Sequence, residues 1–161
     1  MINIKTSLSL FFVLASLVAC DDDAKKYTAE FPRFEPLQLK LAENELPKVG
    51  KSVVVEAPQR KMGKHLYEVT YQWTVSGPAE AVQRYGKSNL YTERTPAPTD
   101  TITFSQSGRY NIVLVASYEV SGIGKGQSFT ETFPAKMGSA KYDGSALRYR
   151  VTLERTIDVD D

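Results

Sequence analysis

Few residues of this 161-residue chain could carry out chemistry, and the sequence places them far apart. His65 is the only histidine, and it stands in a polar turn close to Lys61 and Lys64. Catalysis by a serine or cysteine nucleophile needs a neighbouring base, and zinc needs several His or Cys ligands. The acidic residues at 21–23 and 158–161 lack the spacing that wraps a calcium ion. The sequence therefore predicts no enzyme, no metal site and no cofactor.

Cys20 is the only cysteine, and it directly follows a short apolar segment. Residues 1–19 hold one basic residue, Lys5, and then an apolar run too short to span a bilayer, which takes ~20 apolar residues. A basic start, an apolar middle and small residues before a cleavage point are typical of a signal peptide. We therefore expect residues 1–19 to be a signal peptide rather than a membrane anchor.

The residues Leu17-Val18-Ala19-Cys20 resemble the lipobox of bacterial lipoproteins. The resemblance implies cleavage before Cys20, a diacylglycerol group on its thiol and a fatty acyl chain such as palmitate on the new amine. Several acyl chains would anchor the protein durably, whereas a single chain binds a membrane only marginally. The alternative is that Cys20 is an incidental small residue beside an ordinary cleavage site.

Three aspartates at 21–23 follow the cysteine. Acidic residues in this place resemble the surface-export signal of lipoproteins from the Bacteroides group, which implies a lipid-anchored protein of the outer membrane or cell surface. An aspartate directly after the cysteine also resembles an inner-membrane retention signal of enteric bacteria. A third interpretation is a solvated tether, because a run of like charges repels and extends. We favour the bacterial outer membrane or cell surface.

The charge balance and the cysteine content exclude several classes of protein. Lys and Arg number 20 against 19 Asp and Glu, so the chain has no basic excess that would attract nucleic acid. With Cys20 acylated, no thiol remains for a disulfide, and stability must come from a packed core. A chain of this length is expected to form one domain.

A change of pattern near residue 37 predicts where the folded domain begins. Residues 24–36 contain two prolines, mixed charges and no sustained periodicity, so we expect residues 20–36 to be a flexible tether. Leu37, Leu39 and Leu41 alternate with other residues, which predicts a strand with one buried face. We therefore place the folded domain at 37–161.

The rest of the chain consists of short alternating runs separated by turn-forming residues. The clearest predicted strand is 66–76, and 108–118 is apolar enough for a central strand. Further strands are expected at 52–57, 101–105, 128–134 and 147–159, with 110–134 forming a hairpin around the glycine-rich turn. The pattern predicts an all-β sandwich.

Three segments resemble the strand motifs of PKD-type immunoglobulin-like domains: 48–55 (KVGKSVVV), 71–77 (YQWTVSG) and 107–115 (SGRYNIVLV). The resemblance covers 37–120 and implies an immunoglobulin-like (PKD-like) β-sandwich, although the chain lacks the aspartate that the family carries after its tryptophan. Residues 125–161 exceed what a minimal domain of this type needs, so we expect added strands or an ordered extension there.

Two aromatic residues should have defined places in such a sandwich. We expect Trp73 to fill the space between the sheets beside Ile112 and Leu114, in place of a disulfide. Tyr110 follows a turn, and we expect its hydroxyl to bond back to a nearby backbone group.

The stretch 78–98 is the longest without clean alternation, and it carries Arg84, Tyr85, Tyr91 and Arg94. Tyrosine can stack on a sugar or a peptide and still form hydrogen bonds, so these four residues are candidates for glycan or peptide binding. The simpler interpretation is that they cover a hairpin between two strands.

No feature of the sequence specifies an activity. We favour a non-catalytic binding or scaffolding protein that docks on an outer-membrane or surface complex through an exposed strand edge. The alternative is a glycan-binding or peptide-binding module that uses 78–98, and an enzyme has the least support. The expected partners are a membrane, through the lipid anchor, and either a protein or a surface glycan, but no nucleic acid.

Overall fold

The structure is a computed structural model that describes residues 28–42, 45–78, 82–89, 97–121, 127–134 and 137–161. The regular elements within these ranges are β-strands, which confirms the predicted all-β class. In chain order they are β1 (Arg33–Phe34), β2 (Gln38–Lys40), β3 (Ser52–Glu56), β4 (Gln59–Lys61), β5 (Leu66–Ser76), β6 (Val82–Asn89), β7 (Thr99–Thr103), β8 (Gly108–Val120), β9 (Phe129–Thr132), β10 (Gly138–Asp143) and β11 (Arg148–Val159).

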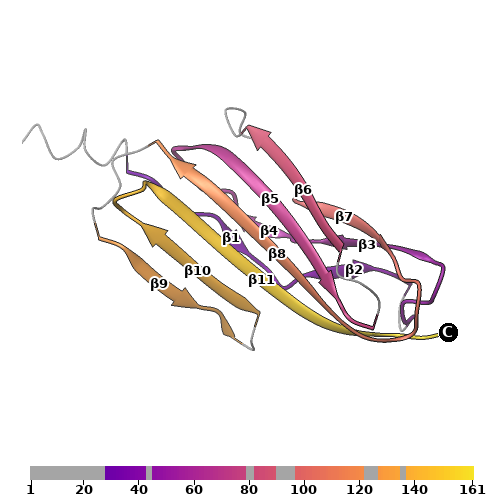
Figure 1. The fold of residues 1–161 in the computed structure, drawn as a ribbon. Helices are drawn as coiled ribbons and strands as arrows, with labels where there is room; N and C mark the ends of the chain where they lie inside the picture. Colours follow the sequence, from indigo (N-terminus) through magenta and orange to yellow (C-terminus); the bar gives the residue numbers. More distant parts are fainter. Residues whose placement is uncertain (1–27, 43–44, 79–81, 90–96, 122–126, 135–136) are drawn as a thin grey trace, which may run out of the picture.

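The described strands form three sheets arranged in two layers (Figure 1). The large sheet has the order β6-β5-β8-β11-β10-β9, the second has the order β2-β3-β7, and β1 pairs with β4. In Figure 1 the large sheet lies in front, and the other two sheets lie behind it. Buried side chains from both layers belong to one hydrophobic cluster, so the layers pack face to face.

β5 and β8 are inner strands of the large sheet, and the alternating sequence of each buries one face. Every second side chain of β8 from Tyr110 to Val120 is buried, and those between are half-buried or exposed. On β5, every second side chain from Val69 to Val75 is buried in the same way. A register irregularity near the start of β5 turns Leu66 inward as well.

Trp73 and Tyr110 take the places expected of them. Trp73 is 4% exposed and lies opposite Leu114 of the neighbouring strand. The Tyr110 hydroxyl donates a hydrogen bond to the carbonyl oxygen of Gln106 at 2.9 Å, and its ring packs on Phe104 with centroids 4.7 Å apart. Both the core position of the tryptophan and the backbone bond of the tyrosine are confirmed.

The predicted hairpin over 110–134 is wrong. β8 pairs with β5 on one side and with β11 on the other, so neither of its edges is free for β9. β9 pairs instead with β10, which forms a hairpin with β11. Residues 125–161 thus add β9 and β10 to the large sheet, as the expected extension.

Residues 28–36, which the sequence assigned to the tether, pack on the fold. β1 pairs with β4, and the ring of Phe31 stacks on Tyr149 with centroids 4.3 Å apart. The physical reason is the width of the large sheet, which has six strands against three in the sheet behind it. Phe31 contacts residues of β9, β10 and β11, so it covers the part that extends furthest.

Residues 1–27, which include Cys20, lie outside the described residues. The signal peptide over 1–19, the lipidated cysteine and the acidic tether therefore stay predictions. Within the described ranges, no helix has the length and apolar character needed to cross a membrane.

Candidate functional site

The four predicted binding residues do not form a described site. Arg84 and Tyr85 lie on β6, an edge strand that pairs antiparallel with β5, whereas Tyr91 and Arg94 fall outside the described residues. The stretch 78–98 thus contains a strand where the sequence suggested a loop. The β5–β6 pairing agrees with the hairpin interpretation, and glycan or peptide binding by these residues stays a prediction.

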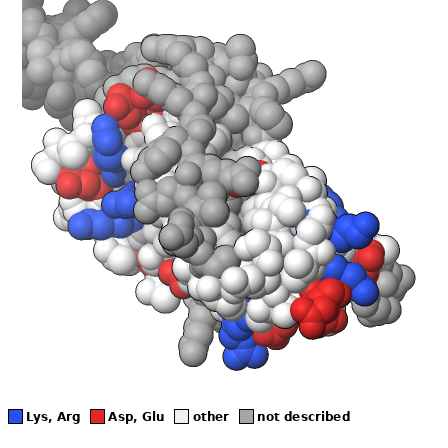
Figure 2. All heavy atoms as spheres, turned by 45° about the vertical axis from the view of Figure 1, so that its right-hand side comes forward, with Lys and Arg blue, Asp and Glu red and all other residues white. Residues whose placement is uncertain are grey.

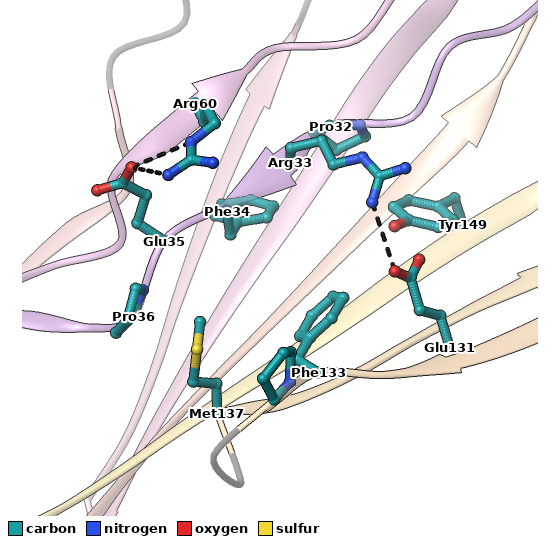
Figure 3. Close-up of a pocket in the computed structure, with 11 residues that line it drawn as sticks. Pro32, Arg33, Phe34, Glu35, Pro36, Arg60, Glu131, Phe133, Met137 and Tyr149 are labelled. Atoms are coloured by element: carbon teal, nitrogen blue, oxygen red, sulfur yellow. Dashed lines mark hydrogen bonds and ion pairs between the residues drawn. The ribbon is translucent and has the colours of Figure 1, made fainter.

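A cavity of about 560 Å³ lies between residues 32–36 and the inner face of the β9 side of the large sheet (Figure 3). Its apolar lining includes Phe34, Phe133, Met137 and Tyr149. The cavity exists because residues 32–36 cross the inner face of the widened sheet without filling it. An apolar site of this size suits a few side chains of a peptide or one small ligand.

Two ion pairs flank the apolar lining of this cavity. Arg33 Nη1 lies 3.4 Å from Glu131 Oε1, and Arg60 Nη2 lies 3.1 Å from Glu35 Oε1. Figure 3 shows the two pairs on opposite sides of the apolar side chains. The arginine side chains are 65% and 78% exposed against 43% and 36% for their glutamates, so positive charge is the more accessible on this rim.

Two lysines share a further carboxylate beside this rim. Lys61 forms an ion pair with Glu30, and Lys64 Nζ lies 3.4 Å from the same carboxylate. The hydrogen bond from Lys61 is the main cause that lowers the pKa of Glu30, and Lys64 acts in the same direction.

Acidic and basic side chains also lie beside one another on the face in Figure 2, which gives no single-sign patch among its described residues.

The buried phenols near the cavity stay protonated at neutral pH. Burial raises the pKa of Tyr149 to about 12, with the charge of Glu131 adding to the effect and Arg33 opposing it. Burial also raises the pKa of Tyr118 well above its usual range, and Gln59 Nε2 donates to its hydroxyl at 3.2 Å. Neither phenol can act as a base or nucleophile at neutral pH.

A second cavity, of about 360 Å³, lies near the first residue of β9. Phe31, Phe129 and Tyr142 line it, and their ring centroids lie between 4.9 and 5.8 Å apart. Phe129 is 39% exposed. The buried Tyr142 hydroxyl has no hydrogen-bond partner among the described residues. The aromatic lining favours an apolar or aromatic group as occupant.

β9 forms an open edge of the large sheet between these cavities. The Phe133 N–H donates to the Gly138 carbonyl oxygen at 2.9 Å, so this residue's backbone groups face β10. The orientation alternates along an antiparallel ladder, which turns the N–H and C=O groups of Thr130 and Thr132 away from β10. They meet no strand of the described chain, because β9 is the last strand of its sheet.

His65 lies in the turn directly before β5. It is half-buried with a φ of 54°, and its carbonyl oxygen accepts a hydrogen bond from the Ser121 N–H at 2.8 Å. No group of three His, Cys, Asp or Glu side chains that could hold a metal ion occurs in the described part of the chain.

Sequence reasoning missed the residues that line the groove, meaning the β9 edge together with the two cavities beside it. Phe31 and Phe34 lie in the segment interpreted as a tether, although two aromatic side chains around a proline are unusual for a flexible linker. Residues 128–134 were expected to form a strand, but their position at a sheet edge was not predicted. Edge position depends on which distant strands pair, and local alternation does not encode that choice.

No protein-family model, curated protein or solved structure matches the chain.

Proposed function

We propose that this protein is a lipid-anchored, non-catalytic interaction module of the bacterial outer membrane or cell surface, built on an immunoglobulin-like (PKD-like) sandwich. The single observation that carries the functional part is the open edge of β9 between two apolar cavities. The resemblance of residues 17–20 to a lipobox supports the anchor, and the strand order supports the fold.

The strand order matches the arrangement in immunoglobulin-like domains, which place strands C′, C, F and G in one sheet and A, B and E in the other. The run β6-β5-β8-β11 corresponds to the first set, and β2-β3-β7 corresponds to the second. Trp73 on β5 lies where these domains carry a core tryptophan. Tyr110 at the start of β8 forms the bond typical of a tyrosine corner. In this scheme β9 and β10 are an insertion between strands F and G.

The chemistry of the groove supports binding of a protein segment. Unpaired N–H and C=O groups on an edge strand can pair with an extended chain, and neighbouring apolar cavities can take its side chains. The charged groups on the rim are paired with one another, and the buried phenols stay protonated. The groove thus offers backbone groups, apolar cavities and paired charges for recognition of such a segment.

The test is site-specific photo-crosslinking in the native membrane, with the photoreactive residue at Thr130 on β9. The matched control carries it at Thr101, an exposed residue on β7, which is the edge of the other sheet. We expect one reproducible protein adduct from position 130 and none from position 101. We also expect Cys20→Ala to release the protein from the membrane fraction and to abolish that adduct.

Two results would contradict the proposal. A Cys20→Ala protein that stays in the membrane fraction would exclude the lipid anchor. Equal adducts from positions 130 and 101, or no adduct from either, would exclude docking through the β9 edge.

A further inference from the structure

The turn between β10 and β11 holds an exposed leucine in an uncommon backbone conformation. Leu147 is 46% exposed and has a φ of 48°, in the left-handed region that disfavours residues with a large side chain. Asp143 Oδ1 accepts hydrogen bonds from the N–H groups of Ser145 and Ala146 at 3.0 and 3.1 Å, which fix the preceding residues of the turn. The turn therefore keeps the Leu147 side chain out of the core.

The left-handed backbone has a local explanation, but the leucine does not. His65 and Leu147 are the non-glycine residues with positive φ in the described part of the chain. Their carbonyl oxygens accept hydrogen bonds from the Ser121 and Val120 N–H groups, each at 2.8 Å, so the two turns close the end of β8. Glycine would make the same backbone bond at position 147 without strain. Leucine adds an exposed apolar side chain, and a strained residue of this kind is a candidate for function.

The described chain begins beside this turn. Thr28 is the first described residue, and it lines the smaller cavity together with Ser128. Ser128 Oγ accepts a hydrogen bond at 3.1 Å from the N–H of Gly144, which lies in the same turn as the leucine. In Figure 1 the turn and the end of β8 lie at the same end of the sandwich, opposite the C-terminus. The proposed anchor at Cys20 is eight residues before Thr28, so this end is the one held at the membrane.

A second apolar side chain is exposed beside the turn. Phe129 directly follows Ser128 and is 39% exposed. Moving one such side chain from water into hydrocarbon favours the inserted state by ~10–100-fold. That gain would bind a free protein only weakly, but a tether makes the contact intramolecular and raises its effective concentration. The exposed side chains are therefore sufficient to orient an anchored domain.

The charges around the turn favour neither anionic nor neutral lipid. Arg148 Nη2, in the residue after Leu147, lies 3.0 Å from Glu119 Oε1. Lys64 Nζ, in the residue before His65, lies 3.4 Å from a carboxylate oxygen of Glu30. Both cations thus have a carboxylate partner, and a juxtamembrane surface attracts anionic headgroups through unpaired Lys and Arg. The contact would depend on apolar insertion rather than on headgroup charge.

We propose that the turn between β10 and β11 is a membrane contact, in which Leu147 inserts into the lipid surface that holds the anchor and Phe129 lies against it. This inference rests on the lipid anchor of the proposed function and adds a second contact with the same membrane. β9 starts at this end and runs toward the other, so its open edge stays accessible to a protein partner (Figure 1).

The test uses the full-length lipidated protein in phosphatidylcholine vesicles whose lipids carry bromine on their acyl chains. A fluorescent amino acid replaces Ala146 beside the leucine, and in the control it replaces Asp161 at the C-terminal end. Bromine quenches a fluorophore that reaches the acyl region, so we expect quenching at position 146 and none at position 161. Added phosphatidylglycerol should change the quenching by less than about twofold, because the nearby cations are paired.

Three substitutions separate the contact from the fold. Leu147→Gly removes the side chain and suits the left-handed backbone, so quenching at position 146 should fall at least about fivefold while the melting temperature holds or rises. Leu147→Met keeps an apolar side chain and should retain the quenching. Leu46→Ala truncates a leucine that is 51% exposed and precedes Pro47, whose carbonyl oxygen bonds to the Asp160 N–H near the C-terminus. It should leave the quenching unchanged.

Three outcomes would overturn the inference for a protein that stays on the vesicles: no quenching at position 146, equal quenching at positions 146 and 161, or quenching that Leu147→Gly does not reduce. Each of these leaves the lipid anchor standing. A blue shift of the emission at position 146 without bromine quenching would assign the turn to contact with a second copy of the chain. A protein that does not stay on the vesicles would exclude the anchor and the contact together.

Discussion

At the scale of single residues, Arg155 interrupts the alternation of β11 and forms a hydrogen bond to a distant segment. Arg155 stands at an inward position of β11, where its neighbours Leu153 and Ile157 are buried. The arginine stays exposed and its Nη1 donates to the carbonyl oxygen of Leu37 at 2.5 Å. The interruption is visible in the sequence, but its partner is not, because the two residues lie 118 positions apart.

Tyr149 should make stability depend on alkaline pH. An unfolded chain releases this phenolic proton near pH 10, whereas burial raises the pKa in the folded protein to about 12. Between these values the folded state binds more protons than the unfolded state, so this contribution is complete below pH 10 and is lost as the pH rises to 12. In urea unfolding, Tyr149→Phe should reduce the alkaline decline by up to ~1.4 kcal/mol per pH unit.

The comparison of Tyr149→Phe with the unchanged protein cancels the titration of the lysines. The substitution also removes a charge that raises the pKa of Tyr118, which reduces the alkaline decline in the same direction. Identical slopes of the unfolding free energy between pH 10 and 12 would contradict the assignment to Tyr149.

At the scale of elements, strands with clear alternation of apolar residues were predictable, including short ones such as β2 and β3, and strands without it were not. The predicted strand 66–76 coincides with β5, and 108–118 lies within β8, because each has enough alternating residues to define a buried face. β1 and β4 have two and three residues and no flanking alternation, too little to show a period. Pairing partners were predicted less well. The predicted hairpin over 110–134 and the observed pairing of β8 with β5 and β11 use the same strands, and they differ only in which distant segments pair.

Residues 28–36 should behave as part of the fold rather than as a tether. Phe31 contacts three aromatic rings on β9, β10 and β11, so Phe31→Ala should lower the free energy of unfolding by ~2–4 kcal/mol, measured in urea. Leu46→Ala is the control, because Leu46 is 51% exposed and its truncation should cost less than ~0.5 kcal/mol. Equal small losses in the two variants would restore the tether interpretation for this segment.

At the scale of the whole molecule, β8 defines two ends. Gly108 at its start lies opposite Val159, close to the C-terminus. Val120 at its far end precedes Ser121, and the described chain begins near that end, where Glu30 bonds to Lys64 (Figure 1). The 13 residues of β8 span ~40 Å as an extended strand.

A lipid anchor at Cys20 should therefore hold the Ser121 end of the sandwich nearer to the membrane than the C-terminus. The eight residues from Cys20 to Thr28 can extend at most ~28 Å, which is shorter than β8. A fluorescent residue introduced at Ser121 should transfer more energy to acceptors in vesicle headgroups than one at Asp161, and Cys20→Ala should abolish both signals. The smaller of the two cavities beside β9 is lined by Thr28 and lies at the Ser121 end, so a partner bound there would also lie close to the membrane. Equal transfer from the two positions would show that the anchor does not orient the domain.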